Sequence, residues 1–181
     1  MDVDLHLRTL EHILRSVDDA HSTRLAESIA EADRIHVAGE GRSGLVVTTL
    51  ASHLTEIGYR SEIYGSPTAS RPVKNDLFLI CSSSGQTQSM IYAGEMAERV
   101  GARVALVTSA LISPLSRIAH TRILLLPPYI PPEAAVSNAA FLREVRGFFE
   151  QAAFLFFGRL AQFLGAQSGR TPEELERRRP E

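Results

Sequence analysis

Two segments of the sequence share one arrangement, in which an apolar strand-like run leads into a glycine loop and then into a helix-like stretch. The first is Arg34–Ala38 with the loop Gly39–Gly44, and the second is Asp76–Cys81 with the loop Ser82–Thr87. The second run is nearly all apolar, as in a strand that a parallel sheet buries on both faces. Three further strand-like runs occur, at Arg60–Tyr64, Arg103–Thr108 and Thr121–Leu126. Strands that alternate with helices in this way predict an α/β fold with a parallel sheet and helices on both faces.

Helices are expected to flank this sheet core, which spans positions 34–126. Positions 4–32 read as a pair of helices, with Ser22 or Thr23 capping the second. The first glycine loop is expected to end where a helix begins, at Leu45, and that helix to run to Ile57 before Gly58. No linker divides the chain, so the sequence predicts one domain over positions 1–181.

The C-terminal part, positions 134–181, contains an unusual concentration of aromatic residues. Seven of the eight phenylalanines lie between Phe141 and Phe163. Their spacing does not fit one helical stripe, and a helix that is apolar nearly all round is buried nearly all round. Two arrangements satisfy this: a deep core helix, or a helix packed both on its own sheet and on a neighbouring subunit. Pro127–Pro132 reads as a turn, and the tail from Thr171 as a short capped helix.

Composition and charge exclude several classes of protein. The 181 residues carry a net charge of −2, so no basic surplus favours a nucleic-acid partner. The single cysteine, Cys81, excludes an internal disulfide and a cysteine-rich metal site, and no histidine pair has metal-ligand spacing. The apolar stretch Phe141–Gly165 is interrupted by charges and reads as no membrane span. We therefore expect a cytoplasmic protein with no metal and no membrane partner.

The first loop, Gly39-Glu-Gly-Arg-Ser-Gly44, formally matches the dinucleotide fingerprint G-x-G-x-x-G. Glu62 lies near the distance expected for a ribose-binding acid, although it falls inside a strand-like run. A nicotinamide or flavin site and a purely structural glycine turn are therefore both open interpretations of this loop.

The second loop favours a single phosphate group. Ser82, Ser84 and Thr87 place hydroxyl donors on a glycine turn at a helix start, where free backbone N–H groups and the helix dipole attract an anion. Helix capping by Ser84 and Thr87 alone is the alternative. Both loops follow strands of one parallel sheet, so both are expected at its carboxyl edge, where such folds bind ligands.

Together, Gly39–Leu45 and Ser82–Thr87 resemble the sugar isomerase (SIS) domain. The wording Val-Ala-Gly-Glu-Gly-Arg-Ser-Gly-Leu, from Val37 to Leu45, is especially similar to the 6-phospho-3-hexuloisomerases of the ribulose monophosphate pathway. The resemblance implies a flavodoxin-like three-layer sandwich with a five-stranded parallel sheet. It also implies a homotetramer, or at least a homodimer, with sites at subunit interfaces. The implied reaction converts D-arabino-hex-3-ulose 6-phosphate to fructose 6-phosphate with no cofactor.

The resemblance also assigns roles to residues. Phosphate binding falls to Ser43, Ser82, Ser84 and Thr87, and Arg42 matches an arginine near the sugar. Glu150 matches the glutamate taken as the catalytic base. The full set of candidate substrate-binding residues is Gly41, Arg42, Ser43, Ser82, Ser83, Ser84, Gly85, Gln86 and Thr87.

Chemistry supports the glutamate independently, because moving a carbonyl between adjacent carbons requires a base. Phe148, Phe149 and Phe154 surround Glu150 in sequence, and an apolar setting raises the pKa of a carboxylate into a useful range. A nearby cation such as Arg42 would stabilise the enediolate. A surface ion pair of Glu150 with Arg146 or Arg143 is the alternative.

The sequence departs from the family in its tail. Related enzymes end in Arg-His-Ala-Asn-Leu-Glu, whereas this chain ends in Glu176-Arg-Arg-Arg-Pro-Glu181 without the histidine. His53, a second candidate catalytic residue, could replace it only if a neighbouring subunit brings it to a site. Two functions follow: an isomerase of phosphorylated ketoses, or a non-catalytic phosphosugar-binding module such as a sensor or regulatory subunit.

Overall fold

In the computed structural model, five parallel strands form one sheet in the order β2-β1-β3-β4-β5. The structure describes residues 3–126 and 139–167, and the side chains of the last helix from position 147 onward. The strands are β1 (Ile35–Ala38), β2 (Ser61–Ile63), β3 (Leu77–Cys81), β4 (Arg103–Thr108) and β5 (Thr121–Leu124). Every predicted strand is present, with ends shifted by no more than two residues. The strand order reverses between β1 and β3, which is the flavodoxin-like arrangement.

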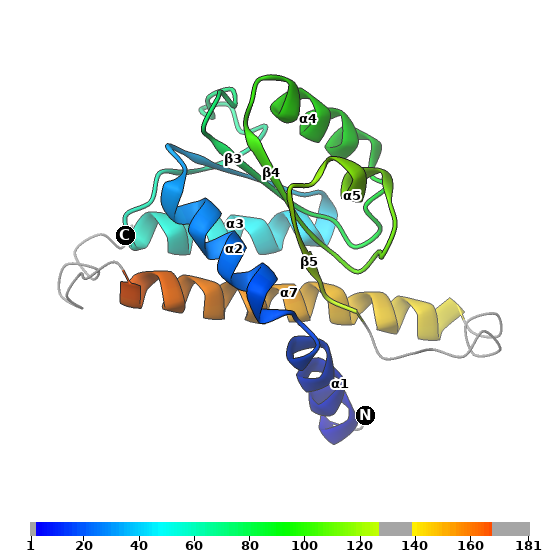
Figure 1. The fold of residues 1–181 in the computed structure, drawn as a ribbon. Coiled ribbons are helices and arrows are strands. Elements are labelled where there is room, and N and C mark those ends of the chain that lie inside the picture. Colours follow the sequence, from blue (N-terminus) through cyan, green and yellow to red (C-terminus); the bar gives the residue numbers. More distant parts are fainter. Residues whose placement is uncertain (1–2, 127–138, 168–181) are drawn as a thin grey trace.

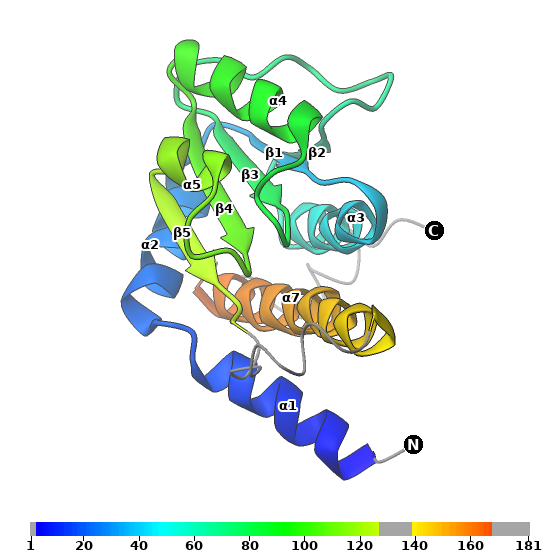
Figure 2. The ribbon, with the colours of Figure 1, turned by 90° about the vertical axis from the view of Figure 1, so that its right-hand side faces the viewer.

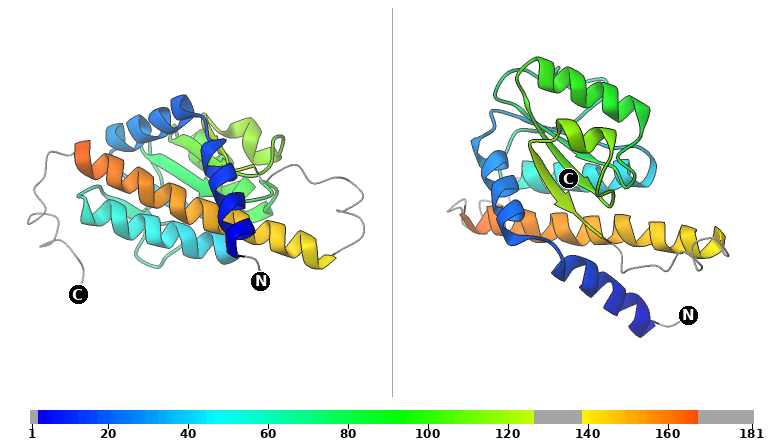
Figure 3. Two further views of the ribbon diagram at one scale, coloured as in Figure 1. Left: turned by 90° about the horizontal axis from the view of Figure 1, so that it is seen from below. Right: turned by 45° about the vertical axis from the view of Figure 1, so that its right-hand side comes forward.

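Helices cover both faces of the sheet, which confirms the predicted three-layer α/β sandwich (Figure 1). They are α1 (Val3–Arg15), α2 (Asp19–Glu31), α3 (Gly41–Glu56), α4 (Gln88–Arg99), α5 (Pro114–Ile118) and α7 (Ala139–Gln167). Helices α4 and α5 lie on one face, and α2, α3 and α7 on the other (Figure 2). Helix α1 extends away from the sheet and crosses α7, beside which α3 also runs (Figure 3).

Two hydrophobic cores hold the layers together because side chains alternate along each strand. On β1, Ile35 and Val37 face the core under α3 and α7, whereas Ala38 faces the core under α4. Strand β3 is buried along its whole length, as the apolar run predicted. The rigid sheet therefore fixes the position of the loops at its carboxyl edge.

The Phe-rich helix α7 is buried on one side and exposed on the other. Phe149, Phe157 and Leu164 are at most 3% exposed and pack in the core beneath the sheet. On the outer side, Phe154 and Phe163 keep 49% and 46% of their surface exposed. A single copy of the chain therefore does not bury this helix all round.

The structure corrects the predicted cap of α2. The cap is Asp18, whose carboxylate accepts hydrogen bonds from the backbone N–H groups of Ala20 (2.7 Å) and His21 (3.2 Å). These bonds, that from His21 foremost, lower the pKa of Asp18. Ser22 and Thr23 lie inside the helix, where their hydroxyls bond to the carbonyls one turn earlier. The predicted turn Pro127–Pro132 and the tail helix at Thr171 lie outside the described residues.

The histidine of β1 has a structural position. His36 is fully buried, and its Nε2 lies 3.0 Å from Oδ2 of Asp76, which also accepts a hydrogen bond from the Val73 backbone. Glu62 lies beside it on β2 and holds Arg34 and Ser70. Burial alone would raise the pKa of Glu62, but the hydrogen bonds from Ser70 and the charge of Arg34 outweigh it and lower the pKa. This network fastens the loop between β2 and β3 to the sheet.

Candidate functional site

The candidate site lies where β1 and β3 end, at the point where the strand order reverses. The chain leaves β1 toward α3 and leaves β3 toward α4, so the two loops separate and open a crevice between them. The first loop and the second loop both border this crevice, as the sequence predicted. A third segment, at the end of β4, completes it with Ser109 and Ala110.

The first glycine segment is shorter than predicted, because α3 begins at Gly41 instead of Leu45. The N–H of Gly44 already donates to the carbonyl of Glu40, a helical hydrogen bond. A Cβ on Gly44 would lie 2.8 Å from the carbonyl oxygen of Gly39, so this glycine permits a close backbone approach. The first turn of α3 therefore carries Arg42 and Ser43 at the edge of the crevice.

The second loop is held by its own hydroxyl groups. Ser82 Oγ accepts a hydrogen bond from the N–H of Gly85, and Ser84 Oγ accepts one from the N–H of Gln86, each at 3.2 Å. Thr87 stands at the cap position of α4 but makes no capping hydrogen bond with its side chain. An accepting hydroxyl keeps its own proton to donate, so these side chains can still bind an anion.

Gly85 is required by the shape of this loop. Its φ of +61° lies in the left-handed region, and a Cβ there would lie 2.2 Å from Oγ of Ser113. Ser113 itself caps α5 in a reciprocal pair with Ser116. The loop is therefore packed against a neighbouring helix cap, which leaves no room for a side chain.

A cavity of about 530 Å³ opens between the loops. Its walls carry neutral hydroxyl and amide groups, one thiol and one carboxylate. The lining residues are Glu40, Ser43, Cys81, Ser82, Ser83, Ser84, Gln86, Thr87, Ser109 and Ala110. Neutral donors at the start of a helix suit the oxygens of a phosphate group. Ser43 and five residues of the predicted second loop thus come together.

Glu150 lies on α7, close behind this cavity but outside its wall. Its side chain is 14% exposed, and Oε2 is buried without a hydrogen-bond partner. The guanidinium of Arg42 lies 3.4 Å from that oxygen, and its own side chain is 60% exposed. Burial raises the pKa of Glu150, and the charge of Arg42 offsets only part of this effect.

Cys81 links Glu150 to the cavity, which sequence reasoning missed. The thiol lines the cavity, is fully buried, and receives a hydrogen bond from the hydroxyl of Ser43. Burial raises its pKa strongly, and the negative charge of Glu150 raises it further. The thiol therefore stays neutral and separates two regions that would hold negative charge. The signal available in the sequence was its position as the last residue of a buried strand, directly before the second loop.

The other sequence-predicted residues lie away from the cavity wall. A Cβ added at Gly41 would meet open space, and Gly85 is a buried residue of the second loop that does not line the cavity. His53 stands in the last turn of α3, about 18 Å from the start of that helix at 1.5 Å per residue. Glu62 is held by Arg34 and Ser70 instead of facing the crevice. A role for His53 stays a prediction that needs a second subunit.

Among the side chains that the structure describes, at positions 3–126 and 147–167, no group of three or more histidine, cysteine or acidic residues could hold a metal ion. Across the same residues, none of the helices is long and apolar enough to cross a membrane.

A parallel α/β sheet with a hydroxyl-lined cavity at its carboxyl edge is typical of proteins that bind phosphorylated ligands, and a comparison with known protein families agrees with this class. The SIS domain family matches residues 28–143, which is more than half of the chain. The chain therefore belongs to the SIS domain family.

Individual relatives are similar to this chain over most of its length. The chain is 32% identical over 161 residues to a 3-hexulose-6-phosphate isomerase of Mycobacterium gastri, covering 88% of this chain and 78% of that one. It is 27% identical to the 3-hexulose-6-phosphate isomerase of Bacillus subtilis, covering 83% and 86%. A solved structure of a Methanococcus jannaschii protein, for which the function of 3-hexulose-6-phosphate isomerase was inferred, superposes with a TM-score of 0.79. It is 20% identical and covers 97% of this chain and 98% of that one, which shows the shared fold.

Proposed function

We propose that this chain is an isomerase of phosphorylated ketoses that converts D-arabino-hex-3-ulose 6-phosphate to fructose 6-phosphate. The observation that carries the proposal is the carboxylate of Glu150, whose Oε2 is buried and lacks a hydrogen bond behind the proposed anion-binding cavity. Two relatives that are similar over most of the chain are named for this reaction.

In this proposal the cavity holds the phosphate of the substrate. Ser84 and Thr87 have hydroxyl protons to donate, and the first backbone N–H groups of α4 have no side-chain cap. The helix dipole adds a favourable field for a negative ligand. Phosphate binding on the second loop would direct the sugar chain toward α7, where Glu150 faces Arg42 of α3.

Glu150 then moves the proton that the isomerisation requires. Its carboxylate takes the proton from C2, the electrons of that bond form the C2–C3 double bond, and the C3 carbonyl oxygen gains a proton. The enediol returns by losing the proton of the C2 hydroxyl and gaining a proton at C3, so that C2 becomes the carbonyl. The raised pKa of Glu150 makes its carboxylate a stronger base than an exposed one. Arg42, 3.4 Å away, would stabilise the negative charge of the enediolate.

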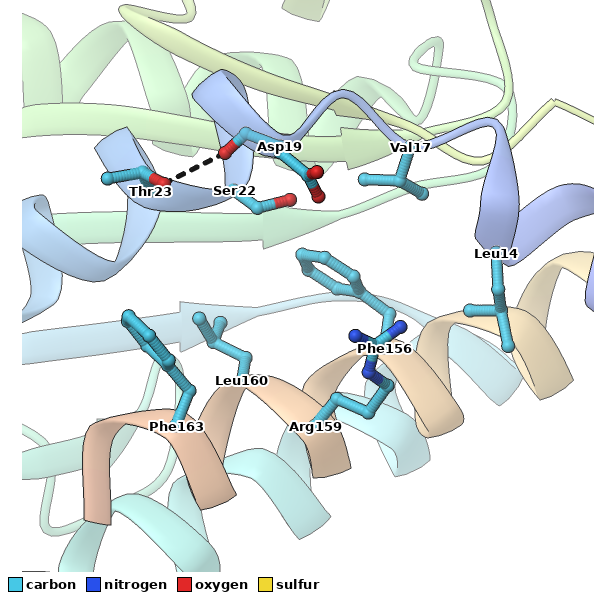
Figure 4. A pocket seen from close by; sticks show the side chains of 9 residues that line it. All are labelled: Leu14, Val17, Asp19, Ser22, Thr23, Phe156, Arg159, Leu160 and Phe163. Atoms are coloured by element: carbon cyan, nitrogen blue, oxygen red, sulfur yellow. Dashed lines mark hydrogen bonds between the residues drawn. The ribbon is translucent and has the colours of Figure 1, made fainter. Parts of the chain in front are cut away.

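A second copy of the chain is part of the proposal. Helix α7 exposes three large apolar side chains, those of Phe154, Leu155 and Phe163. Exposed apolar side chains on a monomer are usually scattered singly, whereas these three lie on one helix. Beside them, a hollow of about 240 Å³ separates α7 from α1 and α2 (Figure 4). Its lining is partly apolar and partly polar, and consists of Leu14, Val17, Asp19, Ser22, Thr23, Phe156, Arg159, Leu160 and Phe163. We infer that α7 is covered by another subunit in a homotetramer or homodimer, which would also be the route for His53 to reach a site. A cytoplasmic location stays a prediction from the sequence.

A non-catalytic phosphosugar-binding module is the second candidate. It would use the same cavity, and the missing family histidine in the tail favours it. Glu150 favours the enzyme, because its Oε2 is buried without a hydrogen bond beside the charge of Arg42. Binding a phosphate does not need such a carboxylate, and a buried acceptor that lacks a hydrogen bond destabilises the fold.

An activity assay separates the two candidates. The purified full chain is mixed with enzymatically prepared 3-hexulose 6-phosphate, and fructose 6-phosphate is followed by a coupled assay. In deuterium oxide, the product is expected to carry deuterium at C3, since the enediol takes its proton from a group that exchanges with solvent. Tight binding of the sugar phosphate without turnover would establish the binding module instead.

A further inference from the structure

Glu40 places a carboxylate on the wall of the cavity. Its backbone is extended at the cap position of α3, with φ −117° and ψ 154°, but its side chain does not cap that helix. The side chain reaches α4 instead, where the hydroxyl of Ser89 donates a hydrogen bond to Oε1. Glu40 therefore faces the first turn of α4, beside the hydroxyl groups of the second loop.

The charge of Glu40 is unusual for a phosphate cavity. Ser43, Thr87 and the other lining side chains are neutral, and among the described residues no cation pairs with Glu40. Arg42, two residues along the chain, forms its ion pair with Glu150. A carboxylate close to a phosphate repels it, because like charges interact strongly where water is partly excluded. A carboxylate also accepts hydrogen bonds and cannot donate them, so the ligand group that it favours is a hydroxyl donor.

We propose that Glu40 is a specificity-determining residue, which disfavours bare anions and favours phosphate esters that carry hydroxyl groups on the neighbouring carbons. The inference rests on the proposed function, since it takes the second loop as the phosphate site. Sulfate, which carries no proton at neutral pH, meets only the repulsion. A sugar phosphate meets a similar repulsion but recovers binding energy by donating a hydroxyl hydrogen bond to Glu40. The residue thus separates the substrate from fully ionised anions without a donor group.

The test compares two ligands in matched variants of the full chain. Dissociation constants for sulfate and fructose 6-phosphate are measured by calorimetry for the wild type, Glu40→Gln and the control Glu98→Gln. Glu98 is exposed near the end of α4, so its substitution removes the same charge outside the cavity. Removal of a negative charge strengthens the binding of both anions in general, and the ratio of the two dissociation constants cancels this effect.

We expect the preference of Glu40→Gln for fructose 6-phosphate over sulfate to fall by about tenfold, the scale of a hydrogen bond to a charged group. Glu98→Gln should keep the wild-type ratio, and Ser89→Ala, which releases the side chain of Glu40, should give an intermediate ratio. An unchanged ratio in Glu40→Gln overturns the inference and leaves the phosphate site intact. If folded wild-type protein binds neither ligand, the phosphate site itself is wrong, and the proposed function fails together with the inference.

Discussion

Glu150 is a carboxylate that folding makes harder to ionise. Its Oε2 is buried and lacks a hydrogen bond, and the burial raises its pKa despite the nearby charge of Arg42. The sequence pointed to this residue through its phenylalanine neighbours. The family resemblance also suggested Arg42 as the nearby cation, although it lies more than a hundred positions away. Their separation of 3.4 Å could not be read from the sequence, because it depends on the packing of α7 against α3.

The raised pKa of Glu150 predicts how stability depends on pH. A carboxyl group whose pKa is higher in the folded than in the unfolded protein lowers stability as the pH rises through the interval between the two values. Glu150→Gln removes this ionisation. We therefore expect the melting temperature of the variant, relative to the wild type, to increase as the pH rises from below the usual glutamate range toward neutrality. A difference that stays constant with pH, measured by differential scanning calorimetry, contradicts the shift.

The hydroxyl groups of the second loop predict a loss of binding. Ser84→Ala with Thr87→Ala should weaken fructose 6-phosphate binding by about 1–3 kcal/mol, the scale for hydrogen bonds to charged groups. Thr23→Ala, on α2 and away from the cavity, serves as the control. Calorimetry that finds equal affinity in the double variant and the control removes the phosphate assignment from this loop.

Other residues of the site were beyond sequence reasoning. Ser109 lines the cavity and shares a hydrogen bond of 2.9 Å with Ser83, a contact between the ends of β4 and β3. A serine after a strand is common, and only the pairing of β3 with β4 brings these two together. Cys81 was visible as a buried thiol, but its place between Ser43 and Glu150 requires the three-dimensional fold.

At the scale of elements, the strands were easier to predict from the sequence than the boundaries between loops and helices. The strands were predictable because each is a short apolar run between turn residues. The start of α3 was not, because Gly41 and Gly44 are typical of loops in sequence. In the structure Gly44 belongs to α3, and its lack of a side chain allows it to approach Gly39 closely. The prediction therefore assigned to a loop four residues that form the first turn of the helix.

The packing of the second loop against the cap of α5 predicts that Gly85 cannot be replaced by a residue with a side chain. Gly85→Ala requires a left-handed conformation and places its Cβ against Ser113, so we expect a loss of stability of about 1–3 kcal/mol together with weaker phosphate binding. The control is Gly158→Ala in α7, where a Cβ meets no atom within 4 Å. Alanine at that helical position should be neutral or stabilising. Equal urea midpoints for the two variants contradict this account of the loop.

At the scale of the whole molecule, the exposed outer side of α7 is the surface where we expect a second subunit to pack. From the sequence alone, Phe156 or Phe157 would be the natural positions to test for a subunit contact. Both are buried within the chain, at 8% and 2% exposure, so a charge there would unfold the protein itself. Phe154 and Phe163 are exposed and offer a cleaner test, which the periodicity of the sequence could not identify.

Charges on that surface predict dissociation without unfolding. Phe154→Glu and Phe163→Glu should convert an oligomer to a monomer near 20 kDa, the mass of one chain being 19.9 kDa, with an unchanged circular dichroism spectrum. Light scattering at micromolar concentration measures the mass. A wild-type protein that is already monomeric contradicts the proposed assembly, and with it the route by which His53 would reach a site.

The most direct test of the proposed function is the turnover of Glu150→Gln with 3-hexulose 6-phosphate, measured beside its affinity for fructose 6-phosphate. Glutamine keeps the shape of the side chain and removes the base. Because a general base contributes about 10²- to 10⁴-fold, we predict that turnover falls by that factor while the affinity stays near the wild-type value. A variant that retains more than about a tenth of wild-type turnover, less than the smallest loss expected for a base, contradicts the assignment of Glu150.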